Sequence, residues 1–147
     1  MAVKSSLPRY AAKRTLLAPL GDVWAFLAEP YNLADWWPGV SGVEPDRRGL
    51  APGARWKVIG PSTPSLFRKP QMTGTLLVLA VEPMRRIAFQ LTGDRIEAEL
   101  ELRDVGPKQT EAVLSVEGPF LVGLRRRFPA QALARLHTLL RTGEDIQ

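Results

Sequence analysis

The hydrophobic pattern of this chain changes its period once, towards the C-terminal end. From Arg95 to Arg103, apolar residues alternate with glutamates at every second position, which is typical of a β-strand with one face in water. From Phe120 to Thr142, apolar residues recur every three or four positions, which predicts an amphipathic helix of about 20 residues. Pro129 lies inside that segment, so we expect it to kink or split the helix, and we expect Gly143 to end it.

Two short helices are expected near the N-terminus. The first spans Pro19–Ala28, with Gly21 or Asp22 as its N-cap and apolar residues at helical spacing. The second spans Asn32–Trp37, with Asn32 as its N-cap.

The remaining periodic segments indicate strands separated by glycine- and proline-containing turns. With the alternating segment, the expected strands are 9–18, 40–48, 54–59, 72–81, 86–91, 95–103 and 110–117. The segment from Met72 to Val81 is apolar on both faces, which favours a central strand. The C-terminal helix must bury its apolar face against this sheet. We therefore expect one α+β domain over residues 1–147: a curved antiparallel sheet of about six or seven strands wrapped around a long C-terminal α-helix, with two short helices between strands 1 and 2.

Composition excludes several kinds of site. The 147 residues include no cysteine, so there is no disulfide, thiolate metal site or cysteine nucleophile, and the single histidine rules out a His-rich metal site. The net charge is +5, but the basic residues are scattered, so we expect no nucleic-acid partner. No apolar run is long enough to span a membrane, and no signal peptide is recognisable, so a cytoplasmic location is expected. We expect no metal and no cofactor.

No catalytic constellation stands out among the ionisable residues. Glu97, Glu99 and Glu101 alternate along one strand and are interpreted as a solvated sheet face. Asp35 and Asp94 lie in or beside turns, where they favour capping roles. His137 lies off the apolar face of the predicted C-terminal helix, which indicates a surface position.

Five short segments, in this order, resemble those of the START-like (SRPBCC) superfamily, which includes polyketide cyclase/dehydrase-like proteins. The segments are A-P-L-G-D-V-W-A-F-L (18–27), N-L-A-D-W-W-P-G-V (32–40), P-G-A-R-W (52–56), E-P-M-R-R-I-A-F (82–89) and T-E-A (110–112). The resemblance covers nearly the whole chain. It implies the helix-grip fold and a cavity between the sheet and the long helix.

The resemblance implies binding of a small hydrophobic molecule (a lipid, a quinone or a polyketide-like compound) in that cavity. Two alternatives remain open: a polyketide cyclase/dehydrase-like enzyme, and a protein-interaction domain of the same fold. Under each reading, the protein is expected to be a monomer or a homodimer. A cavity of roughly 300–1,000 Å³ would favour small-molecule binding. A filled core with an exposed apolar patch would favour protein interaction.

Large apolar side chains and one cation are the candidate ligand-binding residues. Trp36 and Trp37 are adjacent in one helical turn, so we expect one to enter the core and the other to line the cavity entrance. Arg125 lies near the apolar stripe; it either holds an anionic group at the cavity mouth or is ion-paired or solvated. The same two alternatives, an anion contact or an ion-paired or solvated side chain, apply to the strand residues Arg55, Arg86 and Arg95. The full candidate set is Trp36, Trp37, Trp56, Phe67, Phe89, Phe120, Leu121, Leu124, Arg125 and Phe128.

Overall fold

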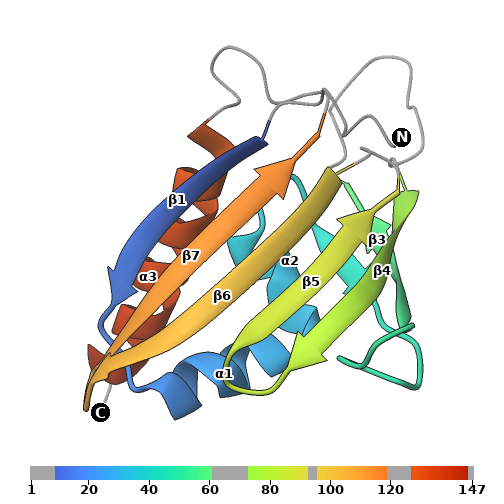
Figure 1. Cartoon of the computed structure of the whole chain (residues 1–147). Coiled ribbons are helices and arrows are strands. Elements are labelled where there is room, and N and C mark those ends of the chain that lie inside the picture. Colours follow the sequence, from blue (N-terminus) through green and yellow to red (C-terminus); the bar gives the residue numbers. More distant parts are fainter. Residues whose placement is uncertain (1–8, 61–72, 93–95, 119–126, 146–147) are drawn as a thin grey trace, which may run out of the picture.

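A seven-stranded antiparallel sheet forms one layer of the protein, and the helices lie against one of its faces (Figure 1). The computed structural model describes residues 9–60, 73–92, 96–118 and 127–145. The strands are β1 (Arg9–Leu16), β2 (Gly42–Glu44), β3 (Arg55–Ile59), β4 (Thr73–Glu82), β5 (Arg86–Leu91), β6 (Ile96–Gly106) and β7 (Gln109–Glu117). The helical elements are α1 (Leu20–Ala28), the 3-10 turn η1 (Pro30–Asn32), α2 (Leu33–Trp36) and α3 (Phe128–Asp145).

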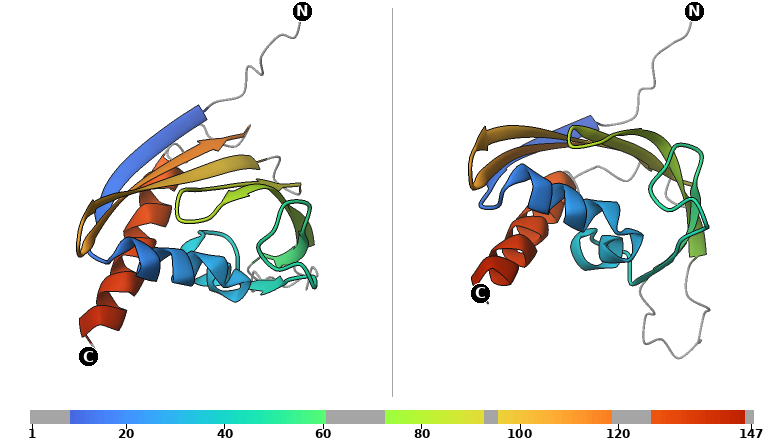
Figure 2. Two further views of the ribbon diagram at one scale, coloured as in Figure 1. Left: turned by 60° about the horizontal axis from the view of Figure 1, so that its bottom comes forward. Right: turned by 90° about the horizontal axis from the view of Figure 1, so that it is seen from below.

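The strand order is β1-β7-β6-β5-β4-β3-β2, so the first and last strands are neighbours. Arg9 of β1 lies opposite Glu117 of β7, and Leu16 lies opposite Thr110. The sheet bends around α3 and the short helices (Figure 2), and a β-bulge between Val78 and Ala80 adds to the bend of β4. The predicted helix-grip fold is confirmed.

The alternating pattern of β6 gives the sheet its two faces, as predicted. Ile96, Ala98, Leu100 and Leu102 are buried on the concave side, whereas Glu97 is exposed on the outer side. β7 follows the same rule. Full burial of one such leucine contributes roughly 1.5–3 kcal/mol, so the concave face is where this sheet gains its stability.

The described part of the predicted C-terminal helix is α3. It begins at Phe128, so Pro129 occupies its first turn, and the kink or split expected at Pro129 stays a prediction. Proline fits there because the first N–H groups of a helix have no acceptor within it. Gly143 does not end the helix, which continues to Asp145, since glycine permits a helix end without enforcing one. Residues 119–126 of the predicted helix lie outside the described residues.

The predicted helix caps are also corrected. Pro19 is the N-cap of α1, in place of Gly21 or Asp22, and its carbonyl accepts the N–H groups of Asp22 and Val23 at 3.0 Å each. Asn32 is the N-cap of α2 as predicted, but its side chain makes no capping hydrogen bond to α2. Its Nδ2 instead donates to the carbonyl of Phe26 at 2.9 Å, which ties α2 to α1.

Two strands differ from the prediction in extent or covering. β2 retains only three residues of the segment expected to pair over 40–48. β4 is an interior strand as expected, but no described helix or strand covers its outer face, and Leu79 is 39% exposed there. All described helices lie on the concave side, so an apolar outer face has nothing to pack against (Figure 2).

Candidate functional site

A small cavity lies between the concave face of the sheet and the segment α1–η1–α2. We call it the inner cavity. Its volume is about 20 Å³, which is about the space of one water molecule. The described residues of its lining are almost all apolar: Leu27, Glu29, Pro30, Leu33, Trp36, Leu50, Trp56, Leu76, Val78, Ile87, Phe89 and Leu100.

Two layers of the fold supply this lining. The strands β3 to β6 contribute inward-facing side chains, because every second residue of a strand points to the same face. Trp56 and Val58 of β3 are buried, whereas Lys57 between them is exposed. The helical side contributes Leu27 and Leu33, whose burial fixes α1 and α2 against the sheet.

Both adjacent tryptophans are buried, so the expectation that only one of them enters the core is wrong. Trp36 is 4% exposed and Trp37 is 1% exposed. α2 ends at Trp36, and the backbone of Trp37 is extended (φ −89°, ψ 114°). The 100° rotation of a continuing helix therefore does not separate the two rings. Their centroids lie 5.5 Å apart at right angles.

Trp37 fills the space where the cavity was expected to meet the C-terminal helix. Its ring packs edge-on against Phe89 of β5 (centroids 5.1 Å apart) and Phe128 of α3 (5.0 Å). Each such pair contributes roughly 0.5–1.5 kcal/mol beyond burial. No described residue of α3 lines the inner cavity. The cavity therefore lies against the short helices rather than against α3.

One wall of the cavity is the loop 45–54 between β2 and β3. Trp56 Nε1 donates to the carbonyl of Gly49 at 2.8 Å, which holds Leu50 over the cavity. Asp46 accepts the backbone N–H groups of Arg48 and Arg55, both at 2.9 Å. The bond from the Arg55 N–H is the main reason that the pKa of Asp46 lies below its usual value. The loop is thus fixed at its base by Asp46 and at its tip by Trp56.

Glu29 is the only charged side chain among the described lining residues. It lies at the joint between α1 and η1, where its Oε1 accepts the N–H of Tyr31 at 3.4 Å. Asp35 is exposed and does not line the cavity. Proton transfer within the described lining would therefore depend on one carboxylate at its margin.

The candidate ligand-binding residues divide into three groups. Trp36, Trp56 and Phe89 line the inner cavity, and Trp37 and Phe128 pack beside it. The other candidates, Phe67, Phe120, Leu121, Leu124 and Arg125, lie outside the described residues. Sequence reasoning missed Leu50 and Pro30, which lie in irregular segments where no periodicity marks an inward side chain. Leu76, Val78 and Ile87 were missed as well, although strand alternation could have identified them.

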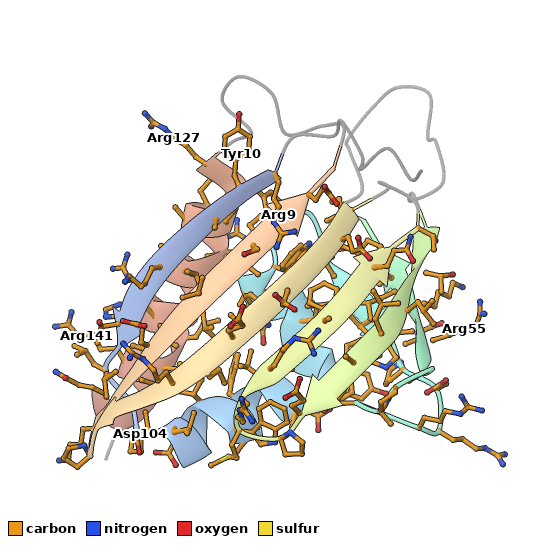
Figure 3. All side chains as sticks on the ribbon, in the orientation of Figure 1. Arg9, Tyr10, Arg55, Asp104, Arg127 and Arg141 are labelled. Carbon is orange, nitrogen blue, oxygen red and sulfur yellow. The ribbon has the colours of Figure 1, made fainter. Side chains whose placement is uncertain are left out.

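The strand arginines lie away from the inner cavity. Arg86 is on the outer face, where its Nε bonds Glu99 at 2.6 Å and its Nη1 bonds Glu82 at 2.7 Å. Arg55 is exposed and projects away from the sheet (Figure 3). Arg95 lies outside the described residues. A separate open depression of about 360 Å³ on the outer face contains the ion pair between Arg86 and Glu99.

Sequence comparison matches residues 8–141 to the family described as polyketide cyclase / dehydrase and lipid transport. The chain belongs to this family. The START-like resemblance is thereby confirmed. No curated protein matches this sequence.

Solved structures similar to this family member share its fold at low sequence identity. Protein NE0264 from Nitrosomonas europaea is 19% identical, with a TM-score of 0.70 over 97% of this chain and 99% of its own. The AHSA1-like protein from Aeromonas hydrophila is 14% identical, with a TM-score of 0.70 over 93% and 94%. DynU16, from the dynemicin biosynthetic locus, is 20% identical, with a TM-score of 0.63 over 92% of this chain and 48% of its own.

None of the helices that the structure describes combines the length and the apolar character needed to cross a membrane.

Proposed function

We propose that this protein binds a small hydrophobic molecule, namely a lipid, a quinone or a polyketide-like compound, in the inner cavity. The observation that carries the proposal is the lining: two layers of apolar side chains face one another, and Glu29 is the only charged group among the described lining residues. Such a site suits an apolar ligand with few polar groups. The family description, which includes lipid transport, supports the same class of ligand.

The volume of the cavity requires that its wall moves when a ligand enters. About 20 Å³ holds a water molecule, whereas ligand pockets measure roughly 300–1,000 Å³. The loop 45–54 is the wall best suited to move, because one side-chain hydrogen bond, Trp56 Nε1 to the carbonyl of Gly49, holds its tip. Displacing Leu50 would open the apolar surface beneath it, and a bound ligand would cover that surface again.

A cyclase-like enzyme is the second candidate, and Glu29 is the observation that favours it. A carboxylate at the margin of an apolar site could transfer a proton to or from a bound reactive chain. A protein-interaction domain has less support, since the exposed large apolar residues come from separate elements. These residues are Tyr10, Leu17, Tyr31, Leu79, Met84 and Val105.

The first test is native mass spectrometry of the purified protein beside its denatured mass. Extra mass that leaves on denaturation supports the proposal and identifies the ligand. If no extra mass is found, the melting temperature is measured with and without dodecanoic acid, decylubiquinone and an anthraquinone. A ligand at 100 times its Kd should stabilise the fold by about 2.7 kcal/mol. A clean mass together with no shift from any compound would overturn the proposal.

Two matched variants locate the site. Leu76 is buried in the lining, whereas Leu79 of the same strand is exposed on the outer face. Leu76→Trp should abolish the thermal shift and Leu79→Trp should retain it. Leu50→Trp fills the same cavity from the loop. It replaces Leu76→Trp in the test if that variant does not fold. Equal binding by all three variants would place the ligand elsewhere. Glu29→Gln separates the two candidates: loss of turnover with retained binding supports the cyclase.

A further inference from the structure

The seam between β1 and α3 lies away from the inner cavity and carries several cations. Even-numbered residues of β1 face the side on which α3 packs, because Leu16 is fully buried there and Arg14 lies opposite the buried Ala112. The Arg14 side chain therefore leaves the strand towards α3. Arg14 itself is exposed, so its guanidinium lies at the margin of the seam.

Helix α3 presents two basic side chains to the same margin. Leu133 and Leu136 are buried and fix the helix against the sheet. His137 follows Leu136 and is half-buried rather than on the surface as predicted, and Arg141 lies one turn later on the same face. Figure 3 shows Arg141 on the β1 side of the molecule.

Helix α3 packs against β1, and Arg14 and Arg141 both lie near enough to His137 to act on its charge. The pKa of His137 lies below its usual value, first because of burial and then because of the positive charges of Arg14 and Arg141. The adjacent inward-facing residues of β7 are Thr110, Ala112, Leu114 and Val116, none of which is charged. On β1, the other titratable side chain of this face is Tyr10.

The side chains of α3 are described as far as Arg141. Among the side chains described in this way, the ion pairs involve the cations Lys13, Lys57, Arg85, Arg86 and Arg103, and neither Arg14 nor Arg141 takes part in any of them. Like charges held close together are stabilised when an anion binds between them. Guanidinium groups also match the geometry of phosphate oxygens.

We infer that Arg14, His137 and Arg141 form a binding site for a phosphate-type oxyanion, either free or carried by an acidic lipid headgroup. None of the three lines the inner cavity, so the site stands whether or not the proposed function is correct. Protonation of His137 adds a third positive charge, so the affinity for the anion rises as the pH falls.

The single histidine of this chain makes the site directly observable. Its imidazole proton signals, followed by NMR against pH, report the pKa of His137 without ambiguity. Inorganic phosphate should raise this pKa by about half a unit or more relative to chloride at equal ionic strength, because the anion stabilises the charged imidazole. Arg14→Gln and Arg141→Gln should each abolish the phosphate-dependent rise.

Arg135→Gln is the matched control. Arg135 is exposed on α3, and two residues of helix place it about 200° from His137. The rise should persist in this variant. Phosphate that shifts the pKa no more than chloride, or a rise that survives in Arg14→Gln and Arg141→Gln, would overturn the site.

Vesicles distinguish the two sources of the anion. A lipid headgroup is supported if the protein co-sediments more with phosphatidylglycerol vesicles than with phosphatidylcholine vesicles. The affinity for the phosphatidylglycerol vesicles should then fall about five-fold in Arg14→Gln. A phosphate-dependent rise in pKa without such retention supports a free phosphate compound. If neither phosphate nor the acidic vesicles distinguish Arg14→Gln from Arg135→Gln, the inference is wrong.

Discussion

Arg86 joins two carboxylates on the outer face of the sheet. Its ion pair with Glu99 lowers the pKa of that carboxyl and raises the pKa of the guanidinium. The groups remain partly exposed to water, which screens their attraction. The pair therefore contributes modestly to stability, and its contribution depends on pH.

We predict that Glu99→Gln destabilises the protein at neutral pH but not in acid. The pKa of Glu99 is depressed in the fold, so its stabilisation is present above its usual pKa and is lost as pH falls through the lowered value. Urea denaturation at about pH 7 and about pH 3 measures the change. Glu97→Gln, on the same face but in none of the described ion pairs, is the control. An equal loss at both pH values would contradict the prediction.

The adjacent residues Trp36 and Trp37 show which side-chain positions could be predicted from the sequence and which could not. Size and hydrophobicity correctly place Trp36 and Trp56 in the lining. The position of Trp37 depends on one backbone angle, since an extended conformation after α2 directs its ring inward. Such a local angle is set by the packing of Phe89 and Phe128, which come from distant parts of the chain.

At the scale of elements, glycines in α1 and in the loop 45–54 have opposite roles. Gly21 is helical and exposed, and an added Cβ would lie no closer than 4.0 Å to Met84. Gly49 adopts a positive φ of 62°, with nothing within 4 Å of an added Cβ. A side chain at Gly49 would therefore be strained by its backbone alone.

We predict that Gly21→Ala stabilises the protein and Gly49→Ala destabilises it. The first gains about 0.5–1 kcal/mol from reduced backbone freedom in the unfolded chain. The second loses roughly 1–2 kcal/mol from the left-handed conformation. Thermal or urea unfolding of both variants beside the parent tests this pair. A Gly49→Ala variant as stable as the parent would show that the loop relaxes without cost.

Element type was predictable wherever side chains alternate against water, as in β6 and β7. Where a segment does not alternate between apolar and polar residues, the extent of its strand could not be predicted from the sequence. The segment 40–48 is half polar throughout, and only three of its residues pair as β2. Gly143 was expected to end the C-terminal helix, but glycine only permits a helix end, and α3 continues to Asp145.

The whole sheet should exchange its amide hydrogens unevenly. β6 and β7 are bonded to a strand on each side, whereas β2 is a three-residue edge strand. We predict protection factors about one hundred-fold higher in β6 and β7 than in β2. Hydrogen–deuterium exchange by NMR measures them, corrected with the intrinsic rate of each sequence. Uniform protection would mean that the molecule opens as a single unit.

The overall architecture was predictable because seven strands and one long amphipathic helix have few ways to bury their apolar faces together. The place of the inner cavity was not, since it is the space left after side chains pack. Leu50 and Pro30 reach that space from a loop and a turn, and only the folded chain brings them beside Leu76. Cavities depend on small differences in volume, to which hydrophobic patterns are insensitive.

The pairing of β1 with β7 has a consequence for synthesis on the ribosome. Arg9 pairs with Glu117, so β1 has no hydrogen-bonding partner in this sheet until β7 has been made, about one hundred residues later. Strands β2 to β6 can pair with their sequence neighbours as they emerge, whereas β1 stays an open edge. The nascent chain should therefore need protection from aggregation chiefly at β1 until β7 has emerged, and the pairing of these two strands completes the sheet.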